Sequence, residues 1–166
     1  MNKNDRLNSA WTDSLTRYQQ PDDTALLSHL RTVHQYNAGF TQMCASTCRD
    51  EKGRNSYEWL AEAVPSVNGT RVLDLACGSG PLLEILYDRN SNLQLTGVDM
   101  SPEELALAKT RLPEGVAQFF ELKAQDLNVI SDNSIDVVLC HWALTLMNPI
   151  GPVLDEIRRV LSTDFI

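Results

Sequence analysis

Short apolar runs alternate with helix-like patterns over the second half of the chain. Four runs predict buried strands, at residues 71–76, 94–98, 117–122 and 135–140. The last of them is apolar almost throughout, which is typical of a strand buried on both faces. Because strands and helices alternate, we expect a parallel sheet with helices on both of its faces.

Prolines and capping residues mark where the helices of this half begin. Pro81 and Pro102 each stand at an expected first helical position, where the missing N–H of proline does no harm. Ser101 and Glu104 have the spacing of a capping box. A final helix is predicted over 152–161.

The N-terminal part follows a different pattern, and we interpret 1–66 as a helical cap placed before a core at 67–166. Asp22 or Asp23 is expected to cap a helix with apolar residues at helical spacing. A second helix is predicted over 56–64, where a proline ends it.

The first predicted strand runs into a glycine turn, Gly78-Ser79-Gly80. Glycine lets the backbone approach a ligand closely, and the helix that follows aims free N–H groups at it. Asp99 follows at the end of the next strand, where a carboxylate can accept both hydroxyls of a ribose. These features predict a nucleoside-binding site.

Two departures from the dinucleotide pattern indicate which nucleoside. The third glycine position holds Leu83, and Asp74 lies in the strand just before the turn. A carboxylate there repels a pyrophosphate and attracts an ammonium or sulfonium group. The charges therefore favour S-adenosylmethionine over NAD, and a nucleotide-dependent oxidoreductase is a distant alternative.

At this point the sequence resembles the class I S-adenosylmethionine-dependent methyltransferases, most closely their small-molecule branch (methyltransferase type 11/25-like). Blocks in the right order carry the resemblance: VLDLACGSGPLLEIL (72–86), LTGVDMSPEELALAK (95–109), FFELKAQDLN (119–128) with SIDVVLCHWALTLM (134–147), and GPVLDEIRRVLS (151–162). The resemblance implies an α/β fold, a Rossmann-like three-layer sandwich with strand order 3-2-1-4 and an N-terminal helical cap. The family's usual strands 5–7 are absent, so we expect a C-terminally truncated chain.

The resemblance also implies a set of cofactor-binding residues. Asp74 is expected at the methionine amine, with the turn residues lining the methionine tail. Asp99 is expected to hold the ribose and Met100 to pack on adenine, while Asp126 accepts from the adenine amino group. The full implied set is Asp74, Ala76 (where the family usually has glycine), Cys77, Gly78, Gly80, Asp99, Met100, Asp126, Leu127 and Cys140.

Residues around the transfer site are less strongly indicated. His141 is either a general base for the acceptor or contributes only its backbone carbonyl. Trp142 either stacks on a substrate or fills the core, and the core is the simpler interpretation. Tyr18, His34 and Tyr36 lie in the segment that relatives fold over the site as a lid, so they are candidate substrate contacts.

The composition excludes some classes of partner. The net charge of −8 is concentrated in the second part of the chain, and no basic stripe favours nucleic acid or an anionic membrane. No apolar run is long enough to span a membrane and the first residues are not those of a signal peptide, so we expect a cytoplasmic protein. Cys44 and Cys48 are interpreted as two small buried helix residues and not as half of a metal site, so no metal is expected.

Several alternatives stay open on sequence alone. Without a fifth strand, the fourth would form an open hydrophobic sheet edge. The chain is then a fragment, a natural short form, or a protein whose edge a partner covers, such as a homodimer. The chain could also be a module that binds the cofactor without catalysing methyl transfer. An aminopropyl transferase that uses the decarboxylated cofactor is the most distant of the alternatives. The sequence names no acceptor beyond a small molecule, and S-adenosylhomocysteine would be the product.

Overall fold

The computed structural model describes residues 9–19 and 23–163. Its centre is a four-stranded parallel sheet in the order β3-β2-β1-β4, formed by β1 (Arg71–Leu75), β2 (Gln94–Asp99), β3 (Ala117–Glu121) and β4 (Val137–Leu139). Strand order and strand direction confirm the predicted Rossmann-like architecture. The first three strands lie within one residue of their predicted bounds.

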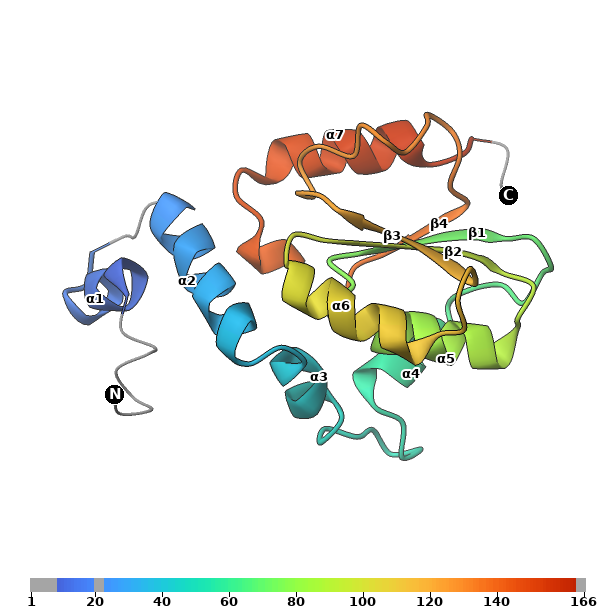
Figure 1. Ribbon diagram of the computed structural model, residues 1–166, viewed down its shortest axis with the longest axis horizontal. Coiled ribbons are helices and arrows are strands. Elements are labelled where there is room, and N and C mark those ends of the chain that lie inside the picture. The colour runs from blue at the N-terminus through green and yellow to red at the C-terminus, as the bar shows by residue number, and fades with distance from the viewer. Residues whose placement is uncertain (1–8, 20–22, 164–166) are drawn as a thin grey trace.

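Helices cover both faces of the sheet, as the alternating pattern predicted (Figure 1). One face is covered by α4 (Ser56–Ala61), α5 (Pro81–Arg89) and α6 (Pro102–Arg111), and the other by α7 (Ile150–Val160). Buried leucines and valines fill the space on each face, in two separate clusters. Asn55, which exchanges hydrogen bonds with Glu58, caps α4. That helix ends three residues before the predicted residue 64, because the chain turns before Pro65.

The fourth strand is shorter than the predicted range 135–140. The Asp136 carboxylate accepts hydrogen bonds from the Arg71 N–H (2.8 Å) and from Nε of the Arg71 guanidinium (3.0 Å). Ile135 instead forms a parallel bridge with Leu161. The predicted sheet edge at the fourth strand is present: among the described residues β4 pairs with β1 alone, and this single bridge lies before its first residue.

Three helices lie beyond the carboxyl ends of the strands: α1 (Ala10–Thr16), α2 (Asp23–Tyr36) and α3 (Phe40–Ala45). Of the two predicted caps of the long helix, Asp22 lies outside the described residues and α2 starts at Asp23. The interpretation of Cys44 and Cys48 as buried helix residues is wrong, since α3 ends before Cys48, which is exposed.

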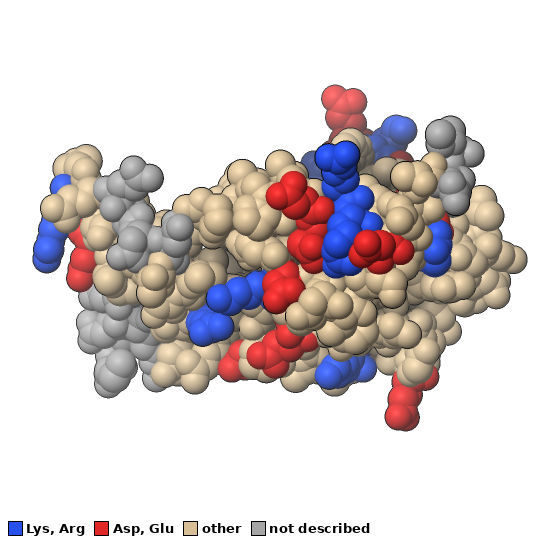
Figure 2. Space-filling view, turned by 90° about the horizontal axis from the view of Figure 1, so that it is seen from above, with Lys and Arg blue, Asp and Glu red and all other residues tan. Residues whose placement is uncertain are grey.

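The surface above α7 has mixed charge (Figure 2). Basic and acidic side chains alternate there, and Arg159 is paired with Glu156 and Asp132. Within the described ranges, every helix is too short or too polar to cross a membrane.

Candidate active site

A cavity that is partly open to solvent lies at the carboxyl ends of the strands. Its walls come from the turn after β1, the end of β2, the loops after β3 and β4, and the cap helices α2 and α3. This is where open α/β sheets bind ligands. Of the predicted site residues, it brings together Asp74, Ala76, Cys77, Gly78, Asp99, Met100, His34, His141 and Trp142.

The turn after β1 is held in a left-handed backbone conformation and tied to β2. Ala76 has φ +61°, and Gly78 has φ +52°. The Gly78 N–H donates to Asp99 Oδ2 at 2.8 Å, and the Cys77 N–H donates to the Val98 carbonyl at 2.9 Å. The turn therefore presents its backbone to the cavity in a fixed position.

Gly80 faces α6. It does not line the cavity, and a β-carbon built on it would lie 2.9 Å from the Ala108 β-carbon of α6. With φ +77° as well, this position requires glycine for the packing of α5 on α6. The assignment of Gly80 to the methionine tail receives no support from its position.

Asp99 is buried at the end of β2, and each of its oxygens accepts a backbone hydrogen bond. Oδ2 accepts from Gly78, and Oδ1 accepts from the Ser101 N–H at 2.9 Å. Burial raises the pKa of this carboxyl above its usual range. Each oxygen keeps a second lone pair for a ligand hydroxyl.

Asp74 is a fully buried acid of the cavity with a strongly raised pKa. It is 1% exposed, and its Oδ1 has no hydrogen-bond partner among the described residues. Burial, together with the nearby Asp99 charge, raises the pKa of Asp74 to about 8. A buried carboxylate oxygen without a donor fits a cationic or hydrogen-bond-donating ligand group.

Glu104 is a cavity residue that the sequence analysis missed. It was assigned to a capping box, but only half of that box forms: the Ser101 hydroxyl accepts from the Glu104 N–H at 3.3 Å. The Glu104 carboxylate instead reaches the cap, where Oε1 accepts from His34 Nδ1 and from the Gly39 N–H, both at 2.9 Å. The hydrogen bond to Glu104 raises the pKa of His34. The remaining oxygen, Oε2, is buried without a partner among the described residues.

His141 lies in an aromatic stack on the opposite wall. Its ring stacks on Tyr57 at 3.9 Å and on Trp142 at 4.8 Å between centroids, and its Nε2 lies 2.8 Å from the Ser56 hydroxyl. Burial lowers the pKa of His141, and its Nδ1 has no partner within the described part of the chain. The expectation that Trp142 fills the core is wrong, since that side chain is 54% exposed at a residue with φ +55°.

The remaining predicted residues do not line the cavity. Asp126 is exposed, and the loop presents Gln125 in its place. Leu127 is buried in the core on the α7 side, where its N–H donates to Glu156 at 2.6 Å. Cys140 packs against the same core.

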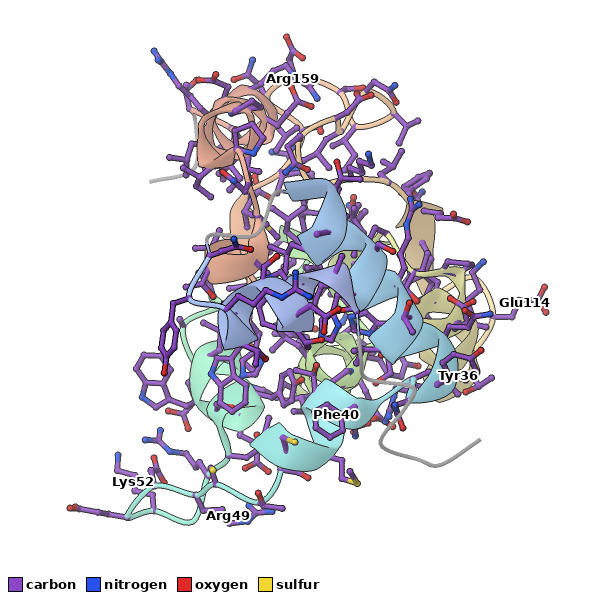
Figure 3. All side chains as sticks on the ribbon, turned by 90° about the vertical axis from the view of Figure 1, so that its left-hand side faces the viewer. Tyr36, Phe40, Arg49, Lys52, Glu114 and Arg159 are labelled. Carbon is purple, nitrogen blue, oxygen red and sulfur yellow. The ribbon has the colours of Figure 1, made fainter. Side chains whose placement is uncertain are left out.

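Two of the three lid candidates also lie away from the cavity. Tyr18 is 99% exposed and Tyr36 is 54% exposed, at the outer end of α2 (Figure 3). His34 is the only one of the three that the cavity includes. Besides Glu104, the cavity residues that sequence analysis missed include Tyr57, Gln42 and three leucines of α2. The helical spacing of these leucines predicted a helix but gave no sign that they line a cavity.

Comparison with known proteins decides the family. Residues 73–164, more than half of the chain, match the family model described as a methyltransferase domain. The chain belongs to this family. It is 33% identical over 103 residues to demethylmenaquinone methyltransferase of Thermotoga maritima, a match over 62% of this chain and 44% of that protein. It is 36% identical over 95 residues to trans-aconitate 2-methyltransferase of Variovorax paradoxus, over 57% of this chain and 35% of that protein. The chain thus spans less than half the length of these relatives.

Solved structures show the same fold. A chain in the complex with the Trm112 methyltransferase activator of Haloferax volcanii superposes with a TM-score of 0.66 at 24% identity, over 80% of this chain and 55% of that chain. The [4+2]-cyclase SpnF superposes with a TM-score of 0.63 at 25% identity, over 80% of this chain and 56% of that chain. Since one neighbour is a cyclase, the fold by itself does not fix the reaction.

Proposed function

We propose that the cavity binds S-adenosylmethionine and that the protein transfers its methyl group to a small-molecule acceptor. The observation that carries the proposal is Asp74, a buried carboxylate with an unpartnered oxygen in the cavity of a methyltransferase-domain chain. Because the pKa of Asp74 is about 8, this carboxyl is mostly protonated at neutral pH without ligand; an ammonium or sulfonium bound beside it would favour its carboxylate form, and a pyrophosphate would not.

The other cavity residues divide the proposed cofactor among them. Asp74 would hold the methionine amine, Asp99 the ribose hydroxyls and Met100 one face of the adenine, while the backbone of the turn from Ala76 to Gly78 would lie against the methionine tail. When bound, the cofactor supplies an activated methyl group, so this chain's task is to position the reactants and exclude water.

His141 is the candidate general base. Its lowered pKa keeps the imidazole neutral at neutral pH, a state in which one ring nitrogen can accept a proton. If the Nε2–H donates to the Ser56 hydroxyl, Nδ1 is the nitrogen free to accept a proton from an acceptor O–H or N–H. Ser56 would then set the tautomer.

A small-molecule acceptor is supported by relatives named for small-molecule methylation, which include a ubiquinone biosynthesis O-methyltransferase of Aeromonas salmonicida. The α2 wall of the cavity is apolar, formed by Leu26, Leu27 and Leu30. The alternative is a module that binds the cofactor but needs a partner for turnover. This alternative is supported by the match to the relative from Thermotoga maritima, which covers only 44% of that protein.

Calorimetric titration tests the proposal. The wild-type chain, Asp74→Asn and the exposed control Asp155→Asn are titrated with S-adenosylmethionine, S-adenosylhomocysteine and NADH. We expect the wild type and the control to bind the first two and not NADH, with S-adenosylmethionine affinity reduced about tenfold or more in Asp74→Asn. Absence of binding by folded wild-type protein would refute the proposal. Binding without methylation of any small-molecule acceptor would support the partner-dependent alternative.

A further inference from the structure

Glu104 is a buried acid that does not make the N-cap hydrogen bond expected at its position in α6. It is 1% exposed, at the third position of α6, where a glutamate ordinarily reaches back to the N-cap N–H. Here that N–H, of Ser101, donates to Asp99. The Glu104 carboxylate is therefore released from capping and turns toward the cavity.

One oxygen of Glu104 holds the cap. Oε1 accepts from His34, in the last turn of α2, and from Gly39, which precedes α3. Because α2 also forms the apolar wall of the cavity, this carboxylate oxygen joins that wall to α6 of the core. Such charge-assisted hydrogen bonds are stronger than neutral ones.

The other oxygen faces the place where the ligand is expected. A β-carbon built on Gly78 would lie 3.8 Å from Oε2, so this oxygen lies beside the turn whose N–H binds Asp99. It is buried and has no partner within 9–19 and 23–163. Buried carboxylate oxygens are ordinarily hydrogen-bonded, so Oε2 lacks a donor that a ligand would bring.

We propose that Glu104 is a further cofactor-binding residue, whose Oε2 accepts a hydrogen bond from a ribose hydroxyl while Oε1 holds the cap. This inference rests on the proposed function. It assigns the ribose two acids, Asp99 from β2 and Glu104 from α6. It also couples the two events: because one carboxylate serves both, cofactor binding stabilises the docked cap, and the docked cap raises cofactor affinity.

Glu104→Gln tests this inference most directly, because glutamine keeps an oxygen that can accept the two hydrogen bonds from the cap. Its amide oxygen still accepts from His34 and Gly39, while its NH₂ replaces the acceptor that faces the cavity. Glu114→Gln is the matched control, since Glu114 projects from the molecule beyond α6 and is exposed (Figure 3). The ligands are S-adenosylhomocysteine and 5′-methylthioadenosine, which has the ribose but lacks the amino-acid end.

We expect Glu104→Gln to weaken both ligands about tenfold or more and Glu114→Gln to weaken neither. A loss confined to S-adenosylhomocysteine would overturn the assignment to ribose. Equal affinities of Glu104→Gln and wild type would overturn the inference and leave the proposed function intact. Absence of binding by the wild type would refute the proposed function itself.

A measurement on the wild type keeps the inference testable if Glu104→Gln fails to fold. Hydrogen exchange of the Gly39 amide is followed with and without S-adenosylhomocysteine. We expect exchange to slow when the ligand is bound, since the carboxylate that accepts this N–H then holds both partners. An unchanged exchange rate at saturating ligand would overturn the coupling.

Discussion

Replacing Asp74 with asparagine should stabilise the ligand-free protein at high pH while it weakens cofactor binding. In the folded chain, burial first and the Asp99 charge second raise the pKa of Asp74 to about 8, against 3.8 as its ordinary value. Asparagine has nearly the same shape and cannot ionise. The substitution therefore removes the cost of a buried charge without leaving a cavity.

Proton linkage sets the sign and the size of the change in the free energy of unfolding with pH. Between pH 4 and pH 8 the folded state holds a proton on Asp74 that the unfolded state has released, so the free energy of unfolding falls as pH rises. It levels off above the folded-state pKa. At about 1.4 kcal/mol per pH unit over this span, the loss is a few kcal/mol and at most about 6 kcal/mol. Asp74→Asn should match wild type near pH 4 and exceed it in stability increasingly toward pH 8.

Urea unfolding of ligand-free wild type, Asp74→Asn and Asp155→Asn at several pH values from 5 to 9 measures this difference. The comparison isolates Asp74, because the other buried acids of the cavity, Asp99 and Glu104, are common to all three proteins. Asp155→Asn should follow wild type throughout, since that side chain is exposed on α7. A difference between wild type and Asp74→Asn that does not change from pH 5 to 8 would refute the reasoning.

Three further substitutions test how the site is supported. Gly80→Ala should destabilise the chain by about 2–3 kcal/mol, because the new methyl would meet Ala108 at 2.9 Å in a left-handed backbone; a thermal melt within 1 °C of wild type would contradict this. Ala76→Gly should be neutral or raise the free energy of unfolding by up to about 1 kcal/mol in urea titration, since alanine there has φ +61°, and a loss above 1 kcal/mol would count against strain at this residue. Arg159→Met should cost about 2 kcal/mol in the same assay, because Arg159 donates to two carbonyls of the loop before β4, whereas the exposed Arg158→Met should cost almost nothing. Equal losses of unfolding free energy for Arg159→Met and Arg158→Met would show that these hydrogen bonds do not stabilise the fold.

Local patterns determined the framework of the site. The bounds of β1, β2 and β3 could be predicted to within one residue, because buried parallel strands are short apolar runs ended by turn residues. The turn at Gly78 and the acid at Asp99 could also be placed from the sequence, since parallel strands end at one edge of the sheet. The charge at Asp74 then indicated a cationic ligand, and its burial is consistent with that interpretation.

Side-chain direction could not be predicted in the same way. Glu104 fits a capping box in sequence, yet its carboxylate hydrogen-bonds His34, which is seventy positions away along the chain. Gly80 belongs to the glycine turn, yet it faces Ala108, and Asp126 lies in the expected loop, yet Gln125 faces the cavity.

The sequence by itself thus determined which strands form and where the ligand-binding edge lies, because these depend on hydrophobic period and on turn residues that are local in the chain. The strand order was implied by the resemblance to the methyltransferase family. Only the tertiary structure decided which acids line the cavity and which glycines pack helices. That depends on how α2, α5 and α6 meet, and contacts between segments this far apart leave no periodic signal in the sequence.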